Sequence, residues 1–394
     1  MTQQTFPGEG FELSEDLRML QRTVAEFRDN EIMPLEIQLG SQEGGLPDGE
    51  YQRLSQQIKN LGLWCPDVPE ALGGAGLSSF YTAVLREEMS QHRAGFYMPA
   101  YDVFGRTPPA PLFDGTAEQV ENYTKPAVAG DRRAFYASTE PSGGSDPARA
   151  IKTTATKDGD DWVLNGTKTY VMGGMQSDFG LVFARTDPDD AQSTTCFIVE
   201  TSSAGFSREY IPYLIASGVW PAKLTLENVR VPNANVLGEA NGGLKLLQEG
   251  ILGPSRVPFS ASNVGVMVAA QRLAVDYSKQ RETFGAPLAT RQAIQWMMVD
   301  NELDINISRW LTWQAAWAVD SGRISAKETA MACLFSSEAA CKTVDRSQQI
   351  HGGMGMSKWM PFERWYRESR ARKLELGPME IMRMTIIDNV LNPQ

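Results

Sequence analysis

Apolar residues recur every three or four positions near the start of the chain, at Leu17, Leu20, Val24 and Phe27. This spacing is typical of a helix with one buried face. Ser14 and the two acidic residues after it have the composition of a helix start. A glycine-rich loop, PEALGGAGLSS at 69–79, precedes a second helical segment. No strand precedes that loop, which argues against a dinucleotide-binding fingerprint.

From about Ala134 the pattern changes to short runs rich in β-branched and aromatic residues, separated by Gly, Asp, Pro and Ser. The runs are DDWVLNGTKTYVM, GLVFART, TTCFIVET and AKLTLENVRVP. Such runs between turn residues predict strands. We therefore expect a β domain that ends near VPNANVLGEANGG.

Helical spacing returns after Gly243. The clearest apolar stripe in this part has steps of three and four, at Leu303, Ile307, Trp310, Trp313 and Trp317. A stripe of this kind is typical of the core of a helix bundle. The pattern predicts an α+β chain with a helical domain at 1–132, a β domain at 133–240 and a helical bundle at 241–394.

The composition restricts the function. The chain has 394 residues and a formal net charge of -11. That charge argues against a nucleic-acid binder, which needs a basic face to neutralise phosphates. It leaves room for a local basic pocket that binds a phosphorylated small molecule.

Cysteine and histidine are sparse. The four cysteines show no C-x-x-C spacing and there are two histidines, so we expect neither a disulfide framework nor a metal site. The first residues lack the pattern of a signal or transit peptide, and no apolar run reaches the roughly 20 residues of a membrane helix. We expect a cytoplasmic protein without a membrane span.

Three groups of motifs occur in order along the chain. They are YASTEPSGGSD (136–146) with LNGTKTYVMGG (164–174), SRVPFSASNVG (255–265) with YSKQRETFGAPLATRQ (277–292), and QQIHGGMGMSKWMPFERWYRESRARKLELGPMEI (348–381). Together they resemble the acyl-CoA dehydrogenase family of flavoproteins over essentially the whole chain. The resemblance implies an N-terminal helical domain, a middle β-barrel-like domain, a C-terminal four-helix bundle and a homotetramer.

The first motif has the groups that a flavin needs. It offers hydroxyls and glycine backbone N–H donors, and the pyrimidine edge of a flavin requires fixed donors because it becomes negative on reduction. The resemblance implies that FAD contacts this motif, at Tyr136, Ser138, Thr139, Gly144 and Ser145. The alternative is a Gly/Ser hairpin whose hydroxyls are solvated.

The resemblance implies further FAD contacts along the chain. Tyr170 falls where the family has an aromatic residue against the flavin, and Met172 replaces a threonine there. Pro378 replaces another threonine, and Glu380 lies in the same flavin-contacting stretch. Contacts to the FAD of a neighbouring subunit are implied for Arg281, Thr283, Phe284, Gln292, Gln349, Gly352 and Gly353. A guanidinium such as that of Arg281 binds phosphate oxygens in a bidentate fork.

The thioester side of the site is implied in the same way. The substrate-binding residues are Ser145, which lies near the pantetheine, and Ser255, Arg256 and Gly377. Leu376 keeps the backbone N–H that binds the enolate oxygen in the family.

Both positions at which the family places its catalytic glutamate lack a carboxylate. Gly377 fixes the alignment and puts Leu376 at the first position, and the second is Ser255. Glu375 lies one residue early, and neighbouring residues point in different directions, so unless the backbone shifts we expect it to point away from the flavin, toward a surface or interface. With a shifted turn, Glu375 is itself a candidate base. A third candidate base is Asp102, in the loop that borders the acyl pocket in relatives.

These observations favour an FAD-dependent oxidoreductase that acts on an acyl-CoA thioester. The family reaction is α,β-dehydrogenation, with electrons passed to an electron-transfer flavoprotein. Because the aligned base is absent, two alternatives stay open. One is different chemistry on the same thioester, such as β-elimination. The other is a catalytically silent subunit of a heteromer.

Overall fold

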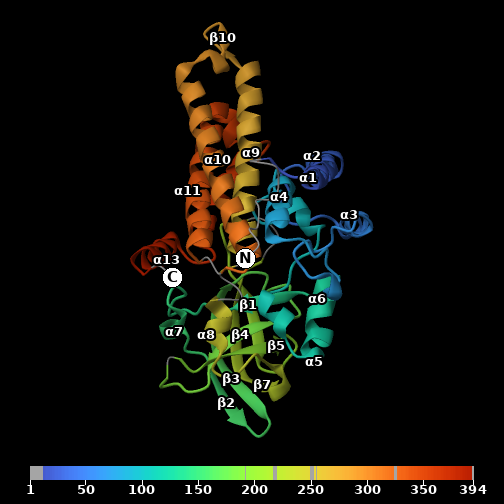
Figure 1. The fold of residues 1–394 in the computed structure, drawn as a ribbon, viewed down its shortest axis with the longest axis vertical. Coiled ribbons are helices and arrows are strands. Elements are labelled where there is room, and N and C mark those ends of the chain that lie inside the picture. The colour runs from blue at the N-terminus through green and yellow to red at the C-terminus, as the bar shows by residue number, and fades with distance from the viewer. Residues whose placement is uncertain are drawn as a thin grey trace.

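The computed structural model describes residues 12–190, 192–215, 220–248, 253, 255–323 and 326–392. A bundle of long helices projects from a β-sheet region, and the N-terminal helices lie along one side of both (Figure 1). The predicted α, β, α order and the predicted fold class are confirmed.

The N-terminal part is helical, as its apolar spacing predicts. The hydroxyl of Ser14 accepts a hydrogen bond from the backbone N–H of Leu17 at 3.4 Å, so it caps the first helix. The helices are α1 (Glu15–Phe27), α2 (Met33–Leu39), α3 (Asp48–Asn60), α4 (Ser79–Met89), α5 (Ala117–Gln119) and α6 (Lys125–Ala129). Val24 and Phe27 of α1 pack in a core that includes Trp64 and Phe104.

The middle part forms one eight-stranded sheet, in the order β6-β7-β3-β2-β4-β5-β8, with β1 paired parallel to β4. The strands are β1 (Ala134–Ala137), β2 (Thr154–Asp158), β3 (Asp161–Val171), β4 (Phe179–Arg185), β5 (Thr194–Glu200), β6 (Phe206–Tyr210), β7 (Ala222–Pro232) and β8 (Val236–Leu237). All residues of β4 are buried, because the strand lies between two apolar clusters. The side chains on one face pack with those of other strands, and the side chains on the other face pack against residues such as Leu112 and Tyr123. Two short helices, α7 (Pro147–Ala150) and α8 (Gly243–Lys245), connect parts of this region.

Three long helices form the bundle, α9 (Arg256–Gln280), α10 (Gln292–Asp320) and α11 (Ala326–His351). The short strands β9 (Glu282–Thr283) and β10 (Ala286–Pro287) join α9 to α10. They lie at the end of the bundle that is farthest from the sheet (Figure 1). The shorter helices α12 (Phe362–Arg372) and α13 (Met379–Leu391) complete the chain.

Trp313 and Trp317, at the end of the apolar stripe of α10, are half-buried against a core cluster. The first part of the stripe is not bundle core, so the interpretation was wrong there. Leu303, Ile307 and Trp310 are between 40% and 57% exposed. The buried face of α10 consists of small and polar side chains with one isoleucine, at Asn301, Ile305, Ser308, Thr312, Ala315 and Ala316. Small side chains let the helices pack closely, and Asn301 donates hydrogen bonds to Gln271 and Ser347. The side chains of Leu303, Ile307 and Trp310 are consequently left outside the core of this chain.

Candidate active site

The loop after β1 is joined to a bulge in β3. The backbone N–H of Thr169 donates to the carbonyl of Thr139 at 2.9 Å. At the bulge Tyr170 has a φ of 53° and an exposed fraction of 56%. A left-handed aromatic residue is strained, and such strain is concentrated at functional sites. The structure thus brings the first predicted flavin motif beside the predicted flavin-stacking ring.

A buried ion pair fixes the base of this loop. Nζ of Lys168 lies 2.7 Å from Oε1 of Glu140, and both side chains are buried. Glu140 also accepts hydrogen bonds from the backbone N–H groups of Lys152 and Thr153. Burial lowers the pKa of Lys168 to about 8, although Glu140 opposes that change. The loop that follows Glu140 is therefore attached to the sheet at both ends.

The rest of the first motif fits a flavin edge. Gly144 packs on Thr139, because a Cβ at Gly144 would lie 2.9 Å from the threonine hydroxyl oxygen. Ser145 is exposed, and Thr139 and Ser145 have no side-chain hydrogen bond to another described residue. Ser138 lies beside the hydroxyl of Tyr136, whose ring packs on Phe183 at 5.4 Å. Donors beside an exposed ring are the kind of groups that the edge of an isoalloxazine requires.

The turn between α12 and α13 holds the aligned base position. Leu376 has a φ of 53° and Gly377 a φ of 99°, so two consecutive residues are left-handed. Nη2 of the buried Arg256 donates to the carbonyl of Leu376 at 3.4 Å. The backbone N–H of Leu376 donates to no other described residue. The N–H that would bind an enolate oxygen is therefore available.

Glu375 is not a surface carboxylate, so that part of the expectation is wrong, while its position at an interface stays a prediction. Its side chain is 19% exposed, and Oε1 is buried without a hydrogen-bond partner among the described residues. Oε2 lies 3.9 Å from Nη1 of Arg372. The expectation assumed regular backbone geometry, and the left-handed residue after Glu375 breaks that assumption.

Burial raises the pKa of the Glu375 carboxyl above its ordinary value. The positive charge of Arg372 and the hydroxyl of Tyr97 act in the opposite direction and do not cancel the effect of burial. A carboxyl with a raised pKa and an unpartnered buried oxygen is typical of a general acid or base.

Tyr213 connects this carboxyl with the predicted flavin site. Its ring lies 6.2 Å from that of Tyr170, and the charge of Glu375 contributes to the raised pKa of Tyr213, after burial. Tyr97 comes from the segment after α4, Tyr170 and Tyr213 from the β region, and Arg372 and Glu375 from the C-terminal part. The candidate site therefore forms where all three parts of the chain meet.

Two other predicted residues make no hydrogen bond or ion pair with Glu375 or Tyr170 among the described residues. Asp102 is the last of three consecutive left-handed residues and forms an ion pair with Arg106. No contact recorded for the described residues connects Asp102 with Glu375 or Tyr170. Ser255 precedes α9 and makes no side-chain capping hydrogen bond.

The second group of predicted FAD residues lies at the far end of the bundle. Phe284 is fully exposed with a φ of 49°, and Arg281 forms no ion pair with another described residue. The turn after α11 lies at the same end, because His351 stacks on Tyr277 at 4.4 Å. The exposed residues there include Gln292, Gln349, Gly352 and Gly353. Figure 1 shows this end of the bundle opposite the sheet, so one chain does not bring the two FAD groups together.

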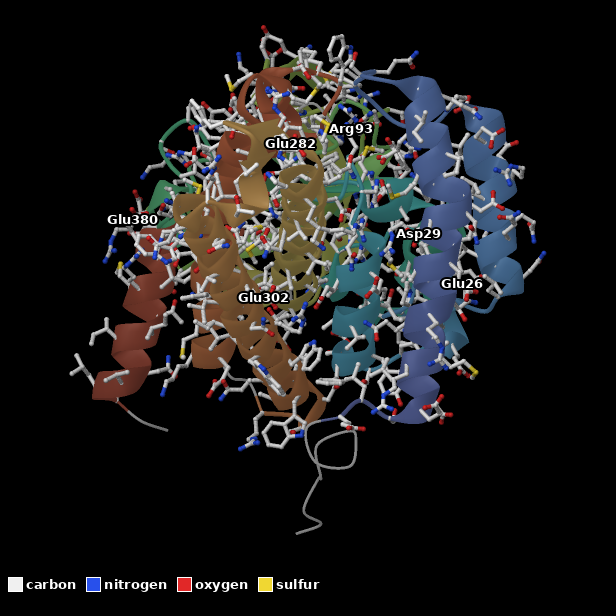
Figure 2. All side chains as sticks on the ribbon, turned by 90° about the horizontal axis from the view of Figure 1, so that it is seen from above. Glu26, Asp29, Arg93, Glu282, Glu302 and Glu380 are labelled. Atoms are coloured by element: carbon white, nitrogen blue, oxygen red, sulfur yellow. The ribbon has the colours of Figure 1, made fainter. Side chains whose placement is uncertain are left out.

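The remaining predicted residues lie near the start of α13 or the end of β3. Met172 and Pro378 are partly buried. Glu380 is exposed on α13, on the opposite side of the molecule from α1 (Figure 2). An exposed carboxylate there is outside the Glu375 cluster.

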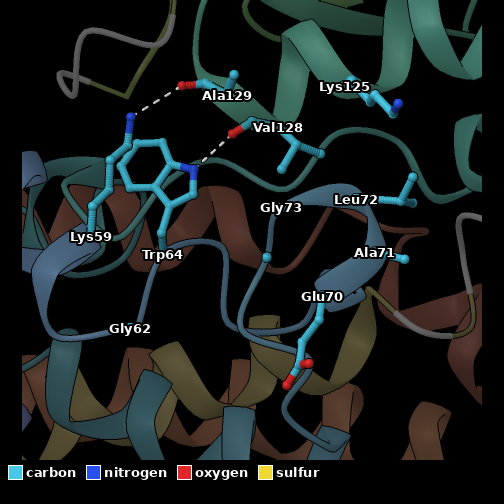
Figure 3. A pocket seen from close by; sticks show the side chains of 11 residues that line it. Lys59, Gly62, Trp64, Glu70, Ala71, Leu72, Gly73, Lys125, Val128 and Ala129 are labelled. Atoms are coloured by element: carbon cyan, nitrogen blue, oxygen red, sulfur yellow. Dashed lines mark hydrogen bonds between the residues drawn. The ribbon is translucent and has the colours of Figure 1, made fainter.

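A cavity of about 690 Å³ lies in the N-terminal part and shares no residue with this site (Figure 3). Lys59 stands over the ring of Trp64 and donates to the carbonyl of Ala129. Lys125 is paired with Glu121. The two cations of the cavity are thus already engaged.

Among the described residues, no group of three or more His, Cys, Asp or Glu side chains could hold a metal ion. In the same part of the chain, no helix is both long enough and apolar enough to cross a bilayer.

Sequence reasoning missed Tyr97, Tyr213 and Arg372. Arg372 lies inside a quoted motif, and its spacing of three residues from Glu375 is the one signal that could have identified it. The two tyrosines come from loops whose positions depend on how the three parts of the chain pack.

Comparison with known proteins finds matches to one family along nearly the entire chain. Residues 14–131, 135–229 and 241–391 match the N-terminal, middle and C-terminal domains of acyl-CoA dehydrogenases. A short-chain specific acyl-CoA dehydrogenase of Mus musculus is 35% identical over 96% of this chain and 91% of its own length. A 3-(aryl)acrylate reductase of Clostridium sporogenes is 33% identical over 96% of this chain and 99% of its own.

A solved structure has the same fold. Butyryl-CoA dehydrogenase from Megasphaera elsdenii superposes with a TM-score of 0.85 and 26% identity, over 98% of this chain and 100% of its own. The three domains occur in the order of the family, and relatives are more than 30% identical over nearly the full length. These matches are sufficient to assign the chain to a family. The chain belongs to the acyl-CoA dehydrogenase family of FAD-dependent oxidoreductases.

Proposed function

We propose that this protein is an FAD-dependent enzyme that interconverts saturated and α,β-unsaturated acyl-CoA thioesters, with Glu375 as the group that takes the α-proton. The observation that carries this proposal is the carboxylate of Glu375. It is buried beside the predicted flavin site, and Oε1 accepts no hydrogen bond from the described residues. An aligned glutamate is therefore not required.

The chemistry follows from the groups around Glu375. The α-C–H of a thioester is a poor acid, so its removal needs a positioned base and a donor for the enolate oxygen. Oε1 of Glu375 is the base, and the unpartnered N–H of Leu376 is the donor. When bound, FAD supplies the acceptor for the β-hydrogen.

The same carboxyl serves the reverse direction. A pKa raised by burial lets Glu375 hold a proton and return it to the α-carbon of an unsaturated thioester. The names of two relatives, the 3-(aryl)acrylate reductase and an acryloyl-CoA reductase of Anaerotignum propionicum, describe reductions. We propose oxidation with electron-transfer flavoprotein as the acceptor, and the direction is an outcome of the test.

The FAD site is composite. Tyr170 and the loop after β1 hold the isoalloxazine, while Arg281 and the turn after α11 of another copy hold the pyrophosphate and adenosine. The exposed stripe of α10 offers the apolar surface for that association, and a homotetramer satisfies every site. The opposite placement of the two groups in one chain supports this arrangement.

The test uses the FAD-loaded protein without oxygen. Butyryl-CoA, hexanoyl-CoA, isobutyryl-CoA and 3-phenylpropionyl-CoA are mixed with it, and loss of flavin absorbance is followed. We expect at least one thioester to bleach the wild type, and Glu375→Gln to slow that reaction about 10²–10⁴-fold at unchanged FAD content. Leu376→Glu, which puts a carboxylate at the aligned position, should not accelerate it. Acceleration by Leu376→Glu together with an unaffected Glu375→Gln would instead show that the native base is absent.

A further inference from the structure

Arg372 is a buried arginine that is clamped independently of Glu375. Its Nε donates to Oδ1 of Asn263 at 2.9 Å, and its Nη2 donates to the carbonyl of Phe259 at 2.6 Å. The guanidinium carbon lies 3.3 Å from the centre of the Phe259 ring. Both partners belong to α9. The position of this charge is therefore set by the bundle, whatever Glu375 does.

The two oxygens of Glu375 have different surroundings. Oε2 lies 3.9 Å from Nη1 of Arg372, which the clamp leaves directed toward it. Oε1 is buried and unpartnered among the described residues. Arg372 therefore approaches the carboxylate at Oε2, and Oε1 is the oxygen left without a hydrogen-bond partner among the described residues.

Other titratable groups around the carboxyl come from every element packed against it. They are Arg372 and Glu368 on α12, Arg256 on α9, which donates to the carbonyl of Leu376, Tyr97 after α4, Tyr213 between β6 and β7, and Cys333 on α11. Burial raises the pKa values of both tyrosines and of Cys333, so these three groups are neutral near pH 7. Glu368 is paired with Arg364 at 2.9 Å. Arg372 is consequently the cation that acts on Glu375.

From this geometry we infer that Arg372 is a positioning residue: its clamped guanidinium favours the ionised form of Glu375 and turns Oε1 toward the substrate. This inference rests on the proposed role of Glu375 as the base. It assigns to Arg372 a place in the reaction that does not require contact with the thioester.

The inference predicts a change in pH dependence. A nearby arginine lowers the pKa of a carboxyl by about one to three pH units. Loss of the charge in Arg372→Met should therefore raise the midpoint of the acidic limb of flavin reduction by that amount. The rate falls at pH 7 and recovers at higher pH. Arg372→Lys keeps a charge without the planar clamp and should give an intermediate midpoint.

A merely structural role gives a different result. It would lower the rate at every pH, together with FAD content or melting temperature, and leave the midpoint where it is. The matched control is Arg370→Met, which removes the same charge from the exposed face of α12 and should not move the midpoint.

A second readout is independent of turnover. The difference in free energy of unfolding between the wild type and the Glu375→Gln variant depends on pH through the pKa of Glu375. The same difference is then measured between two chains that both carry Arg372→Met, one of them with Glu375→Gln in addition. In this second pair, the difference in free energy of unfolding should begin to change with pH at a higher pH than in the first pair. If Arg372→Met does not fold, a pair of chains that carry Arg372→Lys provides the same comparison.

The possible failures are distinguishable. An unchanged midpoint in both Arg372 variants, with Glu375→Gln still inactive, overturns the role of Arg372 alone. Normal flavin reduction in Glu375→Gln overturns the proposed base, and the inference with it.

Discussion

Leu376 has a backbone conformation that costs a non-glycine residue roughly 1–2 kcal/mol, and Arg256 holds its carbonyl in that conformation. This backbone conformation affects the residue before it, Glu375, whose carboxyl is largely buried. Glycine and asparagine signal left-handed positions in a sequence, whereas leucine does not. The burial of Glu375 was for this reason not predictable from its alignment.

Backbone conformation at 376 can be tested by a change that keeps side-chain volume. A β-branched residue is a genuine outlier at positive φ, so Leu376→Ile should lower the free energy of unfolding by about 1–2 kcal/mol and slow flavin reduction. Denaturant unfolding and single-turnover absorbance measure the two effects. Leu374→Ile is the control because Leu374 is exposed and has no positive φ. Equal effects of the two variants would contradict the account.

Glu375→Gln should stabilise the fold at neutral and alkaline pH. The folded-state pKa of Glu375 is raised above its ordinary value of about 4.5. Below pH 4.5 the carboxyl is therefore protonated in both the folded and the unfolded state, and it does not lower the free energy of unfolding. As the pH rises through the folded-state pKa, a buried carboxyl must ionise and the folded state loses stability. Melting curves from pH 4 to 9 should show a higher melting temperature for the variant than for the wild type only in the upper part of this pH range. A variant less stable than wild type at pH 8 would be inconsistent with this.

At the scale of elements, β3 contains two features of the predicted flavin site. Its bulge exposes Tyr170, and two residues earlier Lys168 anchors the loop after β1 through Glu140. The sequence runs predicted this strand well, because alternating apolar residues and turn residues are local signals. The bulge and the ion pair depend on contacts between distant segments, which local patterns do not contain.

Lys168→Met should damage both stability and flavin binding. It leaves the carboxylate of Glu140 buried without its cation, and breaking one partner of a buried pair costs about 3–5 kcal/mol. We expect a lower melting temperature and lower FAD occupancy after purification. Lys152→Met, which removes an exposed charge beside the same loop, should change neither. Full FAD occupancy in Lys168→Met would argue against the anchoring role.

The helix α10 shows where periodicity is insufficient. Steps of three and four predicted correctly that one face is apolar, but they do not say what covers it. Within the chain α10 packs through small residues, and its face with Trp296, Val299, Leu303, Ile307 and Trp310 is between 40% and 61% exposed. This exposed apolar surface is the one on which we propose that copies of the chain associate.

At the scale of the whole molecule, association and FAD binding should be coupled. Leu303→Glu places an unpaired charge on the apolar face of α10, which should weaken association roughly 100-fold or more. Because the proposed FAD site draws on two copies, FAD occupancy should fall with it. Light scattering and absorbance measured on the same fractions test this. Gln52→Glu adds the same charge on the exposed face of α3 as a control. A dissociated chain with full FAD occupancy would refute the composite site.

The direct test of the central claim is exchange of the α-hydrogen of butyryl-CoA with deuterated water on the FAD-loaded enzyme under anaerobic conditions, followed by mass spectrometry. Exchange reports proton transfer at the α-carbon without relying on an electron acceptor. The account predicts deuterium at the α-carbon with the wild type and with Leu376→Ala, and a loss of about 10²-fold or more with Glu375→Gln. Exchange that proceeds at the wild-type rate in Glu375→Gln would show that another group moves the proton.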